Sequence, residues 1–134
     1  MPYKYIEHIA DIMIEATGRT FEQALEAAAL GMFELVAENV KDAEWFEIEE
    51  KSDNLEDLVV FVLSRLNSEA EIREMELSHM KVEEFVRDDK GFFLKAKVFA
   101  GHGKMKNIVK AATHHELSVK EEKGKVTIRV LLDV

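Results

Sequence analysis

The chain has 134 residues and carries a formal net charge of −9 at pH 7, with 47% hydrophobic and 34% charged residues. A chain of this length and composition forms a self-supporting core, so we expect a single domain over residues 1–134. Zero cysteines exclude disulfides, thiolate zinc sites and a cysteine nucleophile. The acidic balance argues against tight autonomous binding to RNA or DNA, which needs clustered positive charge.

No apolar run approaches the roughly 18 residues that a membrane span needs, and the N-terminus lacks a signal-peptide pattern. We therefore expect a cytoplasmic protein without a membrane partner.

The first predicted strand covers residues 12–17, where apolar and polar side chains alternate up to Gly18. A capping pattern follows, because the Thr20 hydroxyl can accept a hydrogen bond from a free amide and the Gln23 side chain can reach back. We expect a helix behind this cap, running to about residue 37. Its apolar residues recur at helical spacing: Phe21, Leu25, Ala28, Met32 and Leu35.

A second helix is predicted behind the cap pattern of residues 53–56, and it ends between residues 67 and 74. Its centre is apolar nearly all round, which indicates that it is covered on more than one side. The apolar stripe consists of Leu55, Leu58, Val59, Val62, Leu63 and Leu66. Residues 45–50, between the two helices, are predicted to form a short strand.

The second half of the chain predicts two hairpins, each with a glycine that supplies a positive φ at the turn. Their strands are residues 78–87 with 92–100, and residues 112–120 with 125–133. Between them, the stretch "AGHGK" is interpreted as a plain turn, or as a weak anion-binding loop. The order β-α-(β)-α-β-β-β-β predicts an α+β fold, with two helices packed on a mostly antiparallel β-sheet.

Charged residues are distributed unevenly along the chain. Residues 34–57 hold ten acidic residues against two lysines, whereas residues 90–110 hold six lysines and no acidic residue. Such segments form solvated faces, or a dipolar surface that docks on a charged partner. The lysine-rich segment is therefore a candidate docking surface.

Two aspartates stand at the ends of predicted strands, on the face opposite to the core. Asp133 is followed by Val134, whose main-chain carboxylate is a second anion, and neighbouring carboxylates repel unless a cation lies between them. Taken alone, Asp11 and Asp133 are most simply solvated acids. Together, Asp11, Asp133 and Val134 would form an all-oxygen cluster that suits a hard cation such as Ca²⁺ or Mg²⁺.

Histidines do not form a recognisable zinc site. His114 and His115 are adjacent in a predicted strand, so they point to opposite faces. His115 shares its face with apolar residues, and we expect a partly buried, hydrogen-bonded imidazole there. His8 and His102 have no diagnostic spacing, and the roles of these two histidines and of His114 and His115 stay open. The serines lie in no setting typical of a nucleophile.

Three motifs, in order, resemble the archease family. His8-Ile-Ala-Asp11 is similar to the family's His-Thr-Ala-Asp motif, with isoleucine in place of threonine. Lys110-Ala-Ala-Thr-His-His115 is similar to Lys-Ala-x-Thr-Tyr-His, with histidine in place of tyrosine. Leu131-Leu-Asp-Val134 is similar to the closing apolar strand of the family. The resemblance covers essentially the whole chain.

The resemblance implies a function as an activator of the RtcB-type tRNA-splicing ligase, and not as an enzyme. That ligase joins RNA ends by a GTP-dependent route through a guanylylated histidine of its own, and archease promotes guanylylation and multiple turnover. The implied ligands of a divalent cation are Asp11, Asp133 and Val134. We expect Ca²⁺, with Mg²⁺ or Mn²⁺ as alternatives, and the ligase as the partner.

Two other functions stay open at this point. The first is a metal-dependent phosphohydrolase, in which Asp11 and Asp133 hold Mg²⁺ and His115 acts as acid or base. The second is a chaperone-like interaction module without a metal.

Overall fold

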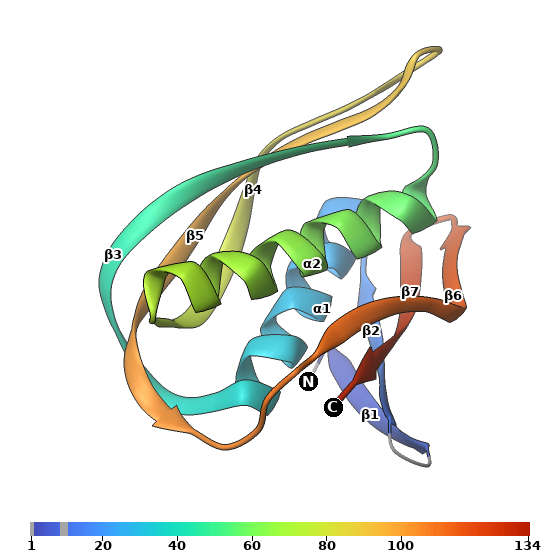
Figure 1. The fold of residues 1–134 in the computed structure, drawn as a ribbon. Coiled ribbons are helices and arrows are strands. Elements are labelled where there is room, and N and C mark those ends of the chain that lie inside the picture. The colour runs from blue at the N-terminus through green and yellow to red at the C-terminus, as the bar shows by residue number, and fades with distance from the viewer. Residues whose placement is uncertain (1, 9–10) are drawn as a thin grey trace.

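The computed structural model in Figure 1 describes residues 2–8 and 11–134, which form two helices and seven strands. The elements in chain order are β1 (Tyr3–His8), β2 (Asp11–Gly18), α1 (Phe21–Val36), β3 (Ala37–Ser52), α2 (Leu55–Arg73), β4 (Glu76–Asp88), β5 (Gly91–Met105), β6 (Ala111–Glu122) and β7 (Lys125–Asp133). The predicted α+β class, with two helices and antiparallel strands, is confirmed. None of the helices in the described ranges is long and apolar enough to cross a membrane.

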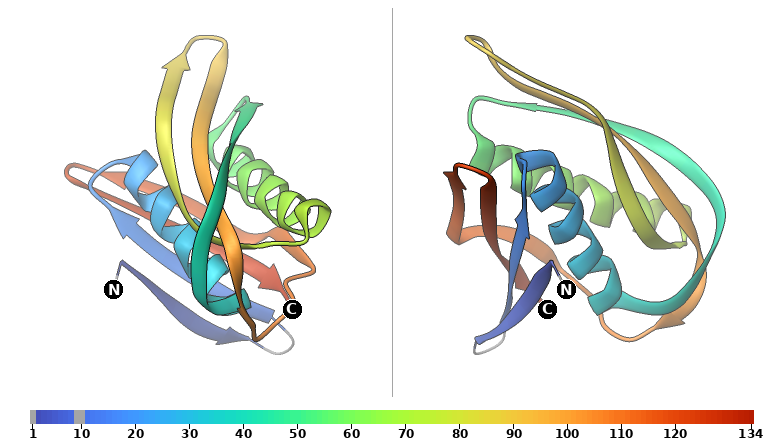
Figure 2. Two further views of the ribbon diagram at one scale, coloured as in Figure 1. Left: turned by 90° about the vertical axis from the view of Figure 1, so that its left-hand side faces the viewer. Right: turned by 180° about the vertical axis from the view of Figure 1, so that it is seen from behind.

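The strands form two antiparallel sheets, whereas the sequence pattern predicts one. The first sheet has the order β1-β2-β7-β6 and the second has the order β3-β5-β4. α1 packs against β2 and β4, and α2 packs against β6 and β3, so each helix contacts both sheets (Figures 1 and 2). α1 requires cover on two sides because residues 27–29 and 31–33 are all buried.

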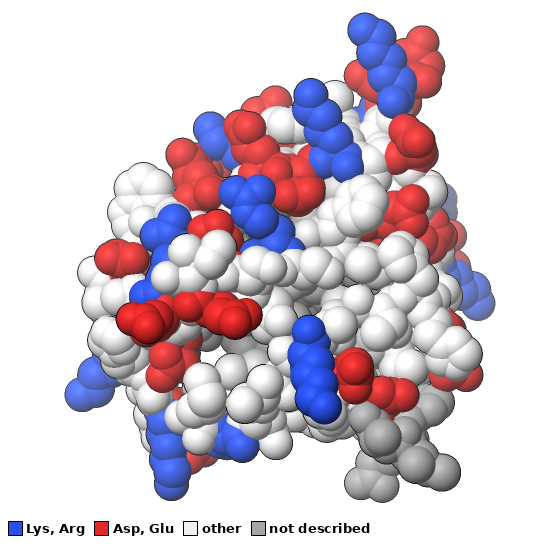
Figure 3. Space-filling model, viewed as in Figure 1, with Lys and Arg blue, Asp and Glu red and all other residues white. Residues whose placement is uncertain are grey.

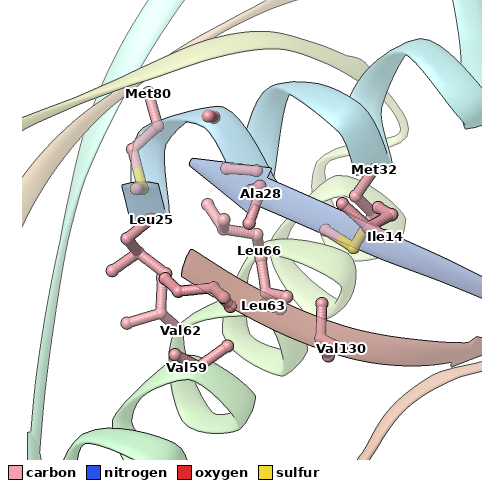
Figure 4. Close-up of a cluster of buried hydrophobic side chains, with 14 of the residues drawn as sticks. Ile14, Leu25, Ala28, Met32, Val59, Val62, Leu63, Leu66, Met80 and Val130 are labelled. Atoms are coloured by element: carbon pink, nitrogen blue, oxygen red, sulfur yellow. The ribbon is translucent and has the colours of Figure 1, made fainter. Parts of the chain in front are cut away.

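The hydrophobic core lies where the two helices meet the sheets. Figure 4 shows its centre, built from Ile14 of β2, Leu25, Ala28 and Met32 of α1, Val59, Val62, Leu63 and Leu66 of α2, Met80 of β4 and Val130 of β7. All six residues of the predicted α2 stripe are buried, as are the alternate residues of β7 from Val126 to Leu132. These parts of the predicted core are confirmed.

Both helices begin at side-chain caps. The Thr20 hydroxyl accepts a hydrogen bond from the Gln23 amide at 3.2 Å, and the Gln23 side chain accepts one from the Arg19 amide at 2.9 Å. The cap of α2 is Asn54, one residue later than predicted, and its side chain accepts from the Asp57 amide at 2.7 Å. Each cap satisfies amides that the first helical turn leaves without a partner.

The sequence pattern does not predict β1. Tyr3 is buried and lies over Gly31 of α1, where ring atoms would be 3.1 Å from an added Cβ. The Tyr5 hydroxyl donates a hydrogen bond to the Gly31 carbonyl oxygen at 2.9 Å. These contacts with a helix more than twenty residues away hold β1 in place. The alternation of apolar and polar residues within β1 cannot predict them, because they depend on residues of α1.

β3 and β5 are longer than predicted, and "AGHGK" lies within a strand instead of a turn. β5 continues through Gly101 and Gly103 to Met105, beside irregular pairing in β3 between Glu38 and Glu44. A Cβ on Gly101 would lie 1.7 Å from the main-chain oxygen of Lys41. The glycine is therefore required by close approach of the β3 backbone.

The acidic and lysine-rich segments lie side by side, because β3 pairs with β5. Glu47 lies opposite Lys97 and Glu49 opposite Lys95, and the Lys95 ammonium is 3.4 Å from a Glu47 carboxylate oxygen. Opposite charges on neighbouring strands stabilise a sheet. Figure 3 shows acidic and basic side chains intermixed over this part of the surface. The lysines of β5 are thus partly neutralised within the chain, and they do not form a separate basic face.

Replacing Gly101 tests the close approach of β3. We expect Gly101→Ala to lower the free energy of unfolding by at least about 1 kcal/mol, because the methyl group would displace the β3 backbone. Urea denaturation measures the change, with Lys104→Ala, an exposed position on the same strand, as the control. Equal stability of the two variants would contradict the observed path of β3.

Candidate metal centre

The two predicted ligand aspartates lie directly opposite each other. Asp11 is the first residue of β2 and Asp133 is the last residue of β7. The two strands pair antiparallel, and their register places Asp11 against Asp133. Side chains of directly opposite residues share one face of a sheet, with Cβ atoms about 4.5–5.5 Å apart. Both carboxylates can therefore reach one ion.

Residues from all three sequence motifs meet in one row across the first sheet. On β1, His8 pairs with Asp11, and on β6, Ala111 pairs with Asp133. The Lys110 amide donates a hydrogen bond to the main-chain oxygen of Asp133 at 2.8 Å. The middle of the first motif, residues 9–10, and the side chain of His8 lie outside the described residues.

The next charged row on the same face is neutralised within the chain. Glu15 lies four residues from Asp11 along β2, and its carboxylate is 3.0 Å from the Lys4 ammonium and 2.7 Å from the Arg129 guanidinium. Hydrogen bonds from these two cations hold the pKa of Glu15 below its usual value. In the described ranges, no lysine or arginine forms such an ion pair with Asp11 or Asp133. Among the described residues, these two carboxylates therefore lack the lysine and arginine partners that neutralise Glu15.

An apolar pair separates the two rows. Met13 and Leu131 lie opposite each other and are both buried. Leu131 lies on the same face of β7 as Asp133, and its burial shows that this face is apolar next to the aspartates. Asp11, Asp133 and Val134 are half-buried. The aspartates therefore stand on a well-packed part of the sheet.

The donor chemistry fits a hard divalent cation. Among residues 2–8 and 11–134, no three His, Cys, Asp or Glu side chains group closely enough to form a metal site by themselves. Among the described residues, a main-chain oxygen is the remaining kind of third donor, and Val134 adjoins Asp133. Two carboxylates and a main-chain oxygen are ligands that Ca²⁺, Mg²⁺ and Mn²⁺ accept.

The expectation for His115 is wrong, because its side chain is exposed. Pairing of β6 with β7 is irregular between Thr113 and Ser118, and Glu116 has a φ of 55°. Such a bulge breaks the alternation of faces on which the expectation rested. His114 lies 3.0 Å from an Asp57 carboxylate oxygen at the start of α2, and His102 is exposed on β5.

One polar cluster was missed by the sequence reasoning. The Ser78 hydroxyl donates a hydrogen bond to Asp42 of β3, and it lies 2.9 Å from Nδ1 of His79. The His79 ring stacks on Phe99 at a centroid distance of 4.2 Å. In a catalytic triad the histidine lies between the carboxylate and the serine, whereas here the Asp42 carboxylate binds the serine directly and lies 3.9 Å from Nδ1 of His79. The cluster therefore does not have the arrangement of a nucleophilic site.

Solved structures of the same fold define the class of protein. The solution structure of Methanobacterium thermoautotrophicum protein 1598 matches with a TM-score of 0.84 and 27% identity, covering 99% of each chain. The crystal structure of an archease from Thermotoga maritima, described as a possible chaperone, matches with a TM-score of 0.69 and 24% identity. That match covers 98% of this chain and 96% of the other. The fold is thus that of small archease-like α+β proteins.

Sequence comparison gives the family. The model of the archease protein family (MTH1598/TM1083) matches residues 3–134. The archease of Methanosarcina mazei is 31% identical over 139 residues, covering 98% of this chain and 95% of the relative. The archease of Thermococcus kodakarensis is 32% identical over 127 residues, covering 89% and 88%. The chain belongs to the archease family.

The Glu15 row predicts a pH dependence of stability. Because Lys4 and Arg129 lower the pKa of Glu15 from its usual 4.5 in the folded chain, the ionised carboxylate stabilises the fold above pH 4.5. This contribution is lost as the pH falls through the lower pKa of the folded state. We expect Glu15→Gln to cost up to about 1 kcal/mol at neutral pH and to flatten the acid side of the stability profile.

Urea denaturation at a series of pH values measures this effect. Glu122→Gln, at an exposed position on β6, is the control and should keep the wild-type profile. If Glu15→Gln and the wild type lose stability in parallel on acidification, the ion pairs of Glu15 do not contribute.

Proposed function

We propose that this archease activates an RNA ligase of the RtcB type and is not itself the catalyst. In this proposal Asp11, Asp133 and a main-chain oxygen of Val134 hold a divalent cation that the ligase requires for efficient guanylylation. The observation that carries the proposal is the cross-strand pairing of Asp11 with Asp133, with no lysine or arginine of the described residues neutralising them. The ligase as partner follows from the motif resemblance, and the three motifs meet in the same row.

The chain's own residues would position the cation. The β2–β7 ladder fixes the separation of the two carboxylates, and the hydrogen bond from Lys110 holds the main chain at Asp133. Ca²⁺ accepts irregular sets of oxygen ligands, which favours it over Mg²⁺, and Mn²⁺ is a further alternative. When bound, such a cation supplies positive charge to phosphate oxygens.

The phosphohydrolase alternative finds no support in the position of His115. This histidine is exposed and lies four residues along β6 from Ala111, which pairs with Asp133. At about 3.3 Å per residue, four residues of extended chain span on the order of 13 Å. That separation is too long for an acid or base acting on a substrate at the aspartates.

Removing one carboxylate tests the proposed metal centre. We expect Asp11→Asn and Asp133→Asn each to weaken Ca²⁺ and Mn²⁺ binding by at least about tenfold, because affinity in such sites follows the number of charged ligands. Titration calorimetry measures the affinity, and RNA joining under substrate excess measures ligase turnover. Both variants should leave product near one equivalent of ligase, whereas the wild-type chain should raise it severalfold.

Glu15→Gln is the matched control, because it removes a carboxylate four residues away on the same face and should keep metal binding and stimulation. With a chelator present to remove metal ions, the free energy of unfolding of Asp11→Asn should equal that of the wild type or exceed it by up to about 1 kcal/mol. The reason is that like charges directly opposite each other destabilise a sheet. Full ligase stimulation by a folded Asp11→Asn variant would refute the metal centre.

A further inference from the structure

A cavity of about 490 Å³ lies between the ends of α1 and α2 and the segment 105–110. Its lining is mainly apolar and includes Met32, Leu66, Met75, Met105, Ile108 and Val109. We call this cavity the apolar groove. Figure 3 shows a hollow in largely uncharged surface between α2 and this segment.

Large apolar side chains at the edge of the groove face water. Met105 is 58% exposed and Ile108 is 70% exposed, although both belong to the lining. Burying apolar surface of this size is favourable, so side chains of this kind around a cavity are typical of binding surfaces. Three of the lining residues are methionines, whose flexible side chains adapt to different partners.

The groove is already formed in the chain alone. The Asn67 side chain donates a hydrogen bond to the Val109 carbonyl oxygen at 3.0 Å, and the Asn107 side chain donates one to the Leu35 carbonyl oxygen at 2.9 Å. These bonds attach the segment 105–110 to both helices. They also occupy the two amides that could orient a small polar ligand, and small-molecule sites depend on such convergent polar groups.

Charged groups of both signs line the groove. Glu71 and Glu76 lie at the end of α2 and the start of β4, where the helix carbonyl groups add negative potential. Lys110 also lines the groove, directly after Val109. Carboxylates in the lining disfavour a nucleic acid. An apolar side chain between a basic and an acidic residue complements this arrangement.

The groove is continuous with the row of Asp11 and Asp133. Lys110 lines the groove, and its main-chain amide donates the hydrogen bond to Asp133. The groove and the aspartate row therefore adjoin at Lys110, so one partner can contact both.

We propose that the apolar groove binds a protein segment with one large apolar side chain, flanked by a basic residue towards α2 and an acidic residue towards Lys110. Resting on the proposed function, the inference assigns this segment to the ligase. The groove then provides affinity for the partner, and the aspartate row provides activation.

Substitutions of two isoleucines test whether the ligase binds in the groove. Ile108→Lys places a charge at its edge, and Ile72→Lys is the control, because Ile72 is 75% exposed and does not line the groove. We expect Ile108→Lys to weaken binding to the ligase by at least about tenfold, with the melting temperature and Ca²⁺ affinity unchanged. Ile72→Lys should bind as the wild type does. Equal ligase affinity of the two variants would overturn the proposal.

The Asp11→Asn variant separates this proposal from the proposed function. It should bind the ligase with wild-type affinity and fail to stimulate it. If the wild-type chain does not bind the ligase at all, the assignment to the ligase fails together with the proposed function. Self-association of the wild type that Ile108→Lys removes would identify a second copy of the chain as the occupant and overturn the assignment as well.

A peptide probe tests the groove without the ligase. Acetyl-Lys-Leu-Glu-amide carries the proposed side chains, and acetyl-Lys-Ser-Glu-amide lacks the apolar one. Only the leucine peptide should shift the backbone amide resonances of residues 105–110, and Ile108→Lys should abolish the shifts. Equal shifts with both peptides, or none with either, would refute the proposed chemistry of the occupant.

Discussion

The antiparallel pairing of β2 with β7 is the constraint on which the rest of the structure depends. It joins a strand near the start of the chain to the last strand and forms the centre of the four-stranded sheet. Its register is strongly specified, because Ile14, Ala16, Ile128 and Val130 are all buried on one face. A shift by one residue would turn this apolar set towards water. Burial of the core face thus determines which residues meet on the opposite face.

That opposite face carries the two candidate ligands, Asp11 and Asp133. With the register fixed, Glu15 meets Arg129 and Asp11 meets Asp133, and the two rows differ in charge balance. The first is neutralised by Lys4 and Arg129, whereas in the described part of the chain the second has no lysine or arginine partner. The β2–β7 ladder therefore places the two aspartates directly opposite each other, where the proposed cation would offset the repulsion between their carboxylates.

The second sheet and the helices have a different role. Acidic residues and lysines occupy separate segments of the sequence. The pairing of β3 with β5 places them beside each other, so the two charges are intermixed on this surface. The ends of the two helices and the segment 105–110 enclose the apolar groove beside Lys110. The surface of the β3–β5 pair is therefore charged and internally paired. The surface at the groove is mainly apolar.

The sequence by itself determined the local structure: both helices from their caps and apolar spacing, the two hairpins from their glycine turns, and the core face of β7 from alternation. These features depend on neighbours within a few residues. The tertiary structure decided which strands pair, and therefore the separation into two sheets, β1 with its tyrosines on Gly31, and the length of β5 through Gly101. It also decided the exposure of His115, through a bulge, and the meeting of His8, Asp11, Ala111 and Asp133 in one row. Local periodicity cannot specify such contacts, because they arise from burial shared between residues far apart in the chain.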